Sequence, residues 1–245
     1  MLSELTPEET SVALDSVAEE ALAEARFDGP PVNALAVAAR LGIAVAWDEQ
    51  QQGRGRYVRL RGHGRGRDRP AILLRPEPRA EREHWTAAHE IGEHLARQVF
   101  AALSVEPAEV PPGAREQVAN QLAGRLLVPT RWVLDDVVEF GWDLIELKHR
   151  YTSASHELIA RRMLEFSPPI IITIFDQEEI TFRRSNAAGC VPGLSDVERR
   201  CWHKTHDSGD VWRDEEGTIE VWGWAVHEPG WQREILRTRL DEAFS

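Results

Sequence analysis

The stretch of sequence that decides the fold covers residues 84–95 and reads HWTAAHEIGEHL. It lies inside residues 79–101, for which the pattern predicts one long helix. Positions four apart on an α-helix share a face, so His89 and Glu93 point the same way. Positions five apart diverge by roughly 140°, so His94 points away from His89 on a regular helix. A single-turn π-bulge in this stretch would swing His94 inward, and that alternative stays open.

The same stretch is close to the His-Glu-x-x-His motif of zinc metalloproteases, in which two residues four apart on a helix bind one ion. His89 and Glu90 fill the first two motif positions, and Glu93 stands where the second histidine is expected. Carboxylate oxygen is an ordinary zinc ligand, so His89 and Glu93 form an acceptable ligand pair. Glu90 is then placed to take a proton from the water that zinc activates. The other interpretation of Glu93 is a helical ion pair with Arg97.

A second helix is predicted from residue 114 to residue 127, and Pro129 cannot continue it. Glu116 and Asn120 lie along the edge of its apolar stripe and should face the first helix. Glu116 is therefore the candidate third metal ligand, and Asn120 is placed to orient a ligand. Glu116 near a helix start is also favoured by the helix dipole alone. The stripe consists of Ala119, Leu122, Ala123, Leu126 and Leu127.

At these two segments the chain resembles the ImmA/IrrE family of bacterial metallopeptidases. Members of that family carry Ala-His-Glu-Leu-Gly-His, followed by Glu-x-x-Ala-Asn-x-Phe-Ala-x-x-Leu-Leu-x-Pro. Residues 88–92 and 116–129 match these two motifs in turn. The flanking segments agree as well, so the resemblance covers residues 10–166. The departure is Glu93, which stands where the family has histidine.

The resemblance implies a zincin-like peptidase of the cytoplasm, with zinc held by His89, Glu93 and Glu116 and with Glu90 as general base. It further implies a protein substrate, a helix-turn-helix repressor that is cleaved in a stress or mobile-element response. One histidine and two carboxylates make a harder ligand set than two histidines, so manganese or iron is an alternative to zinc. The rival function is a non-catalytic regulator, in which an eroded peptidase site binds a repressor or a small ligand.

Composition narrows the choice of partners. The net charge of −12, from 29 Lys and Arg against 41 Asp and Glu, argues against direct nucleic-acid binding. The exception is residues 54–69, which contain seven arginines and read as a basic loop, either solvated or contacting an acidic protein or nucleic acid. No apolar run approaches the length of a membrane span, and the N-terminus lacks a secretion signal. Cys190 and Cys201 fit a reducing cytoplasm.

The fold expected is α+β, a mainly helical zincin-like domain with a small three-stranded sheet, followed by a small C-terminal α/β module. The expected strands of that sheet are residues 43–47, 57–60 and 71–74. Pro168 and Pro169 mark the expected boundary, which separates a metallopeptidase domain (1–167) from a C-terminal sensor or partner-binding domain (168–245).

The C-terminal module is expected to contain a hairpin, a helix, a strand and a final amphipathic helix. The hairpin strands are predicted at residues 170–175 and 180–184, and the helix at residues 195–206. A Trp-bearing strand is predicted at 218–226 and the last helix at 231–244. His203 and His206 with Cys201 form either a metal cluster or part of a solvated helix face, and the sequence leaves both open.

Overall fold

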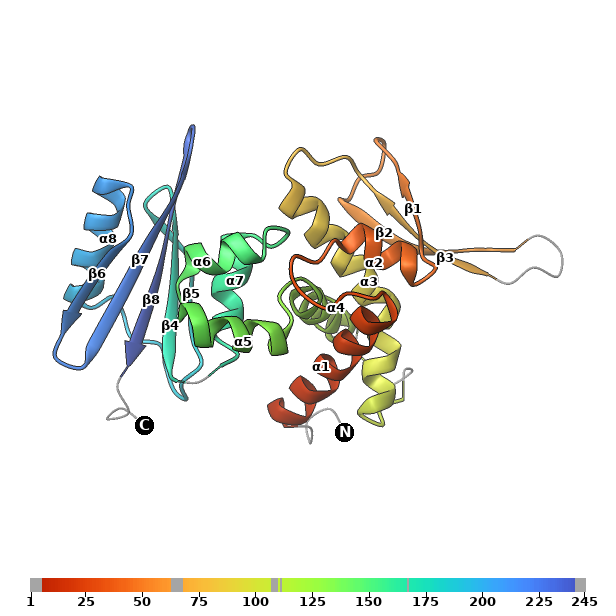
Figure 1. The fold of residues 1–245 in the computed structure, drawn as a ribbon, viewed down its shortest axis with the longest axis horizontal. Helices are drawn as coiled ribbons and strands as arrows, with labels where there is room; N and C mark the ends of the chain where they lie inside the picture. The colour runs from red at the N-terminus through yellow and green to blue at the C-terminus, as the bar shows by residue number, and fades with distance from the viewer. Residues whose placement is uncertain (1–5, 63–67, 107–109, 111, 167, 241–245) are drawn as a thin grey trace. The chain divides into compact units, whose positions relative to one another are not determined.

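The computed structural model describes residues 6–62, 68–106, 110, 112–166 and 168–240. Contacts divide the chain into two compact units (Figure 1). The first comprises residues 1–141 with 149–155, and the second residues 142–148 with 156–245. Residue 167 lies outside the described part, so the domain boundary expected there stays a prediction.

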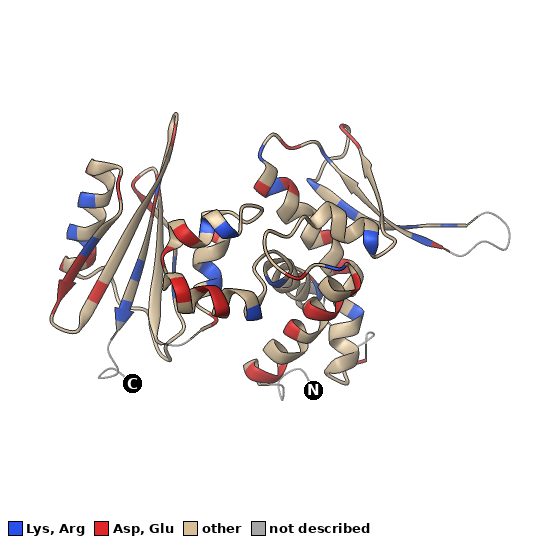
Figure 2. Cartoon of the chain, viewed as in Figure 1, with Lys and Arg blue, Asp and Glu red and all other residues tan. Residues whose placement is uncertain are grey.

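The first unit contains the expected three-stranded sheet. Its strands are β1 (Ala44–Trp47), β2 (Gly55–Leu60) and β3 (Arg69–Leu74), in the order β1-β3-β2. β3 pairs parallel with β1 and antiparallel with β2. β2 is therefore an edge strand, and arginines recur along it (Figure 2). Much of the predicted basic loop, residues 63–67, lies outside the described part of the chain.

Helices form the rest of the first unit, and the local signals explain where they begin. Thr6 caps the first helix in a reciprocal capping box with Glu9. Asn33 caps the second through its side chain. These helices and the ones that follow are α1 (Pro7–Glu24), α2 (Ala34–Arg40), α3 (Ala80–Ala102), α4 (Pro112–Leu127) and α5 (Thr130–Phe140).

The packing of α3 against α4 is unusually close at Gly92. A Cβ atom placed on Gly92 would lie 2.5 Å from the carbonyl oxygen of Ala119 and 3.0 Å from its Cα. Both atoms belong to the backbone of α4, so they cannot move aside as a flexible side chain would. The glycine thus lets the two helix backbones touch, and the side chains on either side of this contact are brought together.

The second unit is built on a five-stranded antiparallel sheet in the order β5-β4-β8-β7-β6. One face carries the helix α8. Val197 and Cys201 of this helix form a core with Phe175, Val221 and Leu236 of the sheet. The elements are α6 (Leu144–Arg150, its first five residues in this unit), α7 (His156–Met163), β4 (Ile170–Asp176), β5 (Glu179–Ser185), α8 (Asp196–Ser208), β6 (Trp212–Glu216), β7 (Ile219–Glu228) and β8 (Trp231–Leu240).

The final segment is where the sequence-based expectation is wrong. Residues 231–240 form the strand β8 and not the predicted amphipathic helix; residues 241–245 lie outside the described part. β8 lies between β4 and β7, and the run from Glu234 to Thr238 is buried on both faces. A strand covered on both faces lacks the alternation that distinguishes it from a helix. The strand β6 was not anticipated either.

The architecture is α+β, a helical unit with a three-stranded mixed sheet and a unit with a five-stranded antiparallel sheet and a helix. Within the described residues, no helix is long and apolar enough to cross a membrane.

We expect Gly92→Ala to lower the free energy of unfolding of the helical unit by about 1–3 kcal/mol, because the added methyl forces α3 and α4 apart. This loss runs against the usual gain of about 1 kcal/mol when alanine replaces glycine in a helix. Urea unfolding followed by circular dichroism measures it. The control is Gly113→Ala in α4, where a Cβ meets nothing within 4 Å. Equal stability of the two variants would contradict the close contact.

Candidate metal centre

The candidate ligands come from α3 and α4. α3 is α-helical throughout residues 80–102, with no π turn, so His89 and Glu93 share a face. α4 brings Glu116 opposite them, and the Nε2 atom of His89 lies 3.6 Å from Oε1 of Glu116. One ligand atom from each of these three residues lies within 4.8 Å of the other two. The three predicted ligands thus lie together in the structure.

The orientation of His89 is set by Asn120, one turn after Glu116 on α4. Nδ1 of His89 lies 3.1 Å from Oδ1 of Asn120, which can only accept, so Nδ1 carries the proton. The amide of Asn120 in turn donates to Oε1 of Glu116 at 3.4 Å. This arrangement leaves Nε2 of His89 with its lone pair directed toward the carboxylates. A ligand histidine is commonly held in this way.

Glu93 has a second partner that the sequence did not suggest. Its Oε2 atom lies 2.8 Å from Nε of Arg115 on α4, whereas the sequence offered Arg97 as the alternative partner. The Arg115 side chain is 44% exposed, and a pair at such a surface contributes at most about 1 kcal/mol. A bound cation can therefore compete for this carboxylate.

Glu90 lies beneath β2 and is only 7% exposed. The backbone N–H of Tyr57 donates a hydrogen bond to its carboxylate. A Cβ on Gly55 would lie 2.5 Å from Cγ2 of Thr86 and 2.7 Å from Oε1 of Glu90, so a larger residue would displace these side chains where the strand crosses the helix. Burial raises the pKa of Glu90 above its ordinary value, and the neighbouring His89 and the Tyr57 N–H oppose the shift.

His94 is turned away from the cluster. Its Nδ1 atom lies 2.8 Å from the hydroxyl of Tyr57, and the two rings meet edge to face with centroids 5.4 Å apart. The residue is half-buried against β2, and burial followed by the charge of Arg59 lowers the pKa of its imidazole. His94 is therefore a packing partner of Tyr57 in this structure. The sequence predicts that His94 faces away from His89, but its contact with β2 was not foreseen.

Comparison with known proteins identifies the family of the chain. Residues 38–164 match the peptidase family described as the IrrE N-terminal-like domain. The match covers 127 of 245 residues, and the chain belongs to this family. None of the curated proteins matches the chain significantly.

A solved structure of a Mycobacterium tuberculosis transcriptional regulator is similar in fold, with a TM-score of 0.63 and 16% sequence identity. The likeness covers 93% of this chain and 75% of that one, so it extends into the second unit.

Membership in this family implies a metal ion, and the residues present fit one. An imidazole nitrogen and two carboxylates, all within 4.8 Å, form a donor set that first-row divalent ions accept. The partial exposure of His89 and Glu93, with 17% and 19% of their side chains accessible, leaves room for solvent or a substrate at the same place.

The contact with Asn120 predicts the tautomer of His89. In metal-free protein with a neutral imidazole, we expect His89 to carry its proton on Nδ1. Long-range ¹H–¹⁵N NMR of the imidazole distinguishes the two nitrogens. Asn120→Asp retains the acceptor and should retain the tautomer, whereas Asn120→Ala should lose the preference. An Nε2-protonated His89 in the unsubstituted protein would contradict the geometry described.

Proposed function

We propose that this protein is a metal-dependent endopeptidase, with the ion held by His89, Glu93 and Glu116 and with Glu90 as general base. The observation that carries the proposal is the convergence of these three donors, within 4.8 Å of one another, beside a buried glutamate. Zinc is the first choice of ion, and manganese or iron is the alternative that two carboxylates favour.

The chemistry divides between the ion and the side chains. When bound, the ion polarises the scissile carbonyl and acidifies a water molecule. Glu90 accepts the proton of the attacking water and later delivers it to the leaving amine. Asn120 keeps the lone pair of His89 Nε2 aimed at the cluster. The backbone N–H of Tyr57 holds the Glu90 carboxylate in place beneath β2.

β2 supplies a place for an extended substrate segment. The carbonyl of Arg54 accepts a hydrogen bond from the backbone N–H of Arg75. In an antiparallel pair every second residue hydrogen-bonds to the partner strand, so the even-numbered residues from Arg54 onward bond to β3. The backbone N–H and C=O groups of the odd-numbered residues Gly55, Tyr57 and Arg59 therefore point away from β3. On this side the N–H of Tyr57 meets Glu90. A peptide paired with this edge would run past Glu90.

The substrate that we propose is a cytoplasmic helix-turn-helix repressor that presents a flexible segment. Three exposed arginines, Arg54 just before β2 and Arg56 and Arg59 within it, favour an acidic segment near the cleavage site. The fold shared with a transcriptional regulator is compatible with a regulatory role. The second unit would then serve as a sensor or partner-binding module.

One observation favours the rival function. Arg115 already pairs with Glu93, so a protein that never binds metal would still have a neutralised carboxylate at this position. In that case the helical unit would bind a repressor without cutting it. Metal content and cleavage, measured on matched variants, separate the two functions.

Metal content tests the choice of Glu93. We expect His89→Ala and Glu93→Ala to lose the ion of the first unit, because each removes a donor. His94→Ala should keep it, because His94 contacts Tyr57 and not the cluster. Equilibrium dialysis with zinc measures the occupancy. Loss of zinc from His94→Ala, with retention by Glu93→Ala, would reverse the assignment.

Cleavage tests the role of Glu90. We expect Glu90→Gln to keep the fold and the metal but to cut a cognate repressor about 10²–10⁴-fold more slowly, the usual contribution of a general base. Glu83→Gln is the matched control, since it makes the same chemical change two helical turns earlier on α3. Mass spectrometry of the products over time gives both rates. A wild-type rate for Glu90→Gln would be incompatible with the proposed base.

A further inference from the structure

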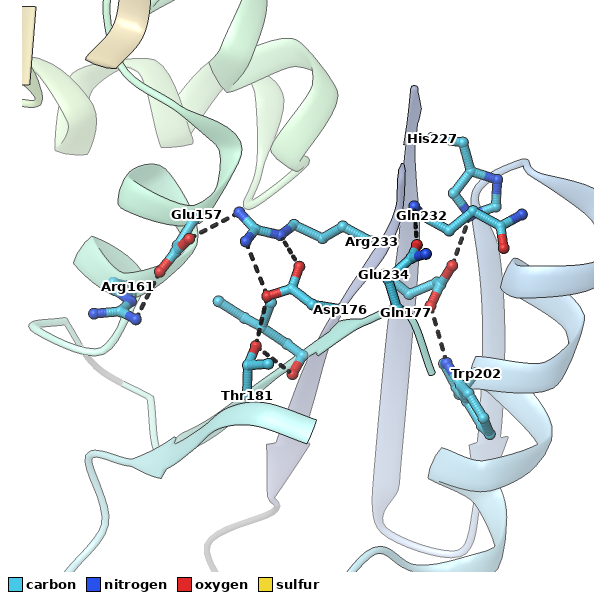
Figure 3. Close-up of polar contacts among 11 residues, drawn as sticks. Glu157, Arg161, Asp176, Gln177, Thr181, Trp202, His227, Gln232, Arg233 and Glu234 are labelled. Carbon is cyan, nitrogen blue, oxygen red and sulfur yellow. Dashed lines mark hydrogen bonds and ion pairs between the residues drawn. The ribbon is translucent and has the colours of Figure 1, made fainter. Parts of the chain in front are cut away.

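A second group of potential metal ligands lies in the second unit, and no part of the peptidase proposal uses it. His206 comes from the last turn of α8, His227 from β7 and Glu234 from β8. The register pairs Ala225 with Glu234 and His227 with Gln232, so His227 and Glu234 lie on the same face of the sheet. Figure 3 shows Glu234 between His227 and Trp202 of α8, with a dashed line to each.

The three side chains converge on one oxygen atom. Oε1 of Glu234 lies 3.0 Å from Nδ1 of His206 and 2.6 Å from Nε2 of His227. All three donor atoms lie within 4.8 Å of one another. A tetrahedral ion with ligand distances of about 2.0–2.2 Å spaces its ligands about 3.3–3.6 Å apart. Small rotations of the two imidazoles are enough to admit an ion.

The burial of Glu234 argues that something positive belongs there. Its side chain is 0% exposed. Its contacts are the indole N–H of Trp202 at 3.1 Å and the two imidazoles, with no Arg or Lys in the described residues paired to it. An ionised carboxylate is costly to bury without a positive partner.

The other deeply buried glutamate of this unit shows the contrast. Glu198 is 2% exposed and receives two hydrogen bonds from the guanidinium of Arg183, at 3.0 and 3.1 Å. Glu234 has imidazoles in the place of that guanidinium. Imidazoles can supply the missing charge either by protonation or by sharing a cation with the carboxylate.

The surroundings of Glu234 match those of a ligand carboxylate. Trp202 donates to Oε2 and is stacked on Phe175 with ring centroids 4.6 Å apart, so it holds the carboxylate with Oε1 toward the histidines. The side chains of His206 and His227 are 21% and 23% exposed. An ion can thus enter from solvent and keep an open position.

We propose that His206, His227 and Glu234 bind a divalent transition-metal ion, with zinc the best fit to two imidazoles and a carboxylate. The site joins the end of α8 to the β7–β8 hairpin. It is independent of the site on α3 and α4 and would exist whether or not the protein cleaves peptides.

Zinc binding is measured by equilibrium dialysis on the full chain, in a His89→Ala/Glu116→Ala background that removes the first site. This background should bind one equivalent of zinc. His206→Asn and His227→Asn, each added singly, should weaken that binding more than about 100-fold, beyond the loss of about 10–100-fold typical of a residue that only orients a ligand. His203→Asn is the matched control, because His203 is exposed on the same helix.

Zinc should also raise the melting temperature of the background protein and of His203→Asn, but not that of the other two variants. Circular dichroism without zinc confirms that each variant is folded. The proposal is overturned if the background protein binds no zinc, or if both His206→Asn and His227→Asn bind it as tightly as the control.

Discussion

The contact on which the candidate peptidase site depends is the approach of α3 to α4 at Gly92. Because no side chain separates the backbone of Gly92 from that of Ala119, the helices lie close enough for short polar side chains to meet. His89 and Glu93 lie on either side of Gly92 along the chain, and Glu116 and Asn120 do the same around Ala119. A wider spacing would leave Glu116 too far from His89 to share an ion. The glycine of the motif is thus as much a part of the site as its ligands.

Helix geometry then decides which side chains take part. With α3 regular throughout, the residue four after His89 faces α4 and the residue five after it faces β2. Glu93 therefore joins the cluster, while His94 hydrogen-bonds Tyr57 and helps to fix the strand that covers Glu90. Glu93 stands where the family motif has a histidine, and its carboxylate is a chemically suitable donor at that position.

Much of this arrangement could be predicted from the sequence, because it depends on local spacing. The capping box of α1, the span of α3 and the pairing of Glu116 with Asn120 on one helix all follow from short-range rules. Contacts between distant segments could not be predicted: nothing local places Tyr57 over α3 or Arg115 beside Glu93. β8 was mistaken for a helix because its burial on both faces hides the strand period. For His206 the sequence offered neighbours on its own helix, whereas the structure pairs it with His227 and Glu234 from two strands.

The central claim is that one histidine and two carboxylates hold an ion between α3 and α4, and a crystal grown with zinc tests it most directly. An anomalous difference map at the zinc edge locates the metal without reference to activity. We predict a peak about 2.0–2.2 Å from Nε2 of His89 and from one oxygen each of Glu93 and Glu116, with His94 still hydrogen-bonded to Tyr57. A peak coordinated by His94, or no peak beside His89, would contradict it.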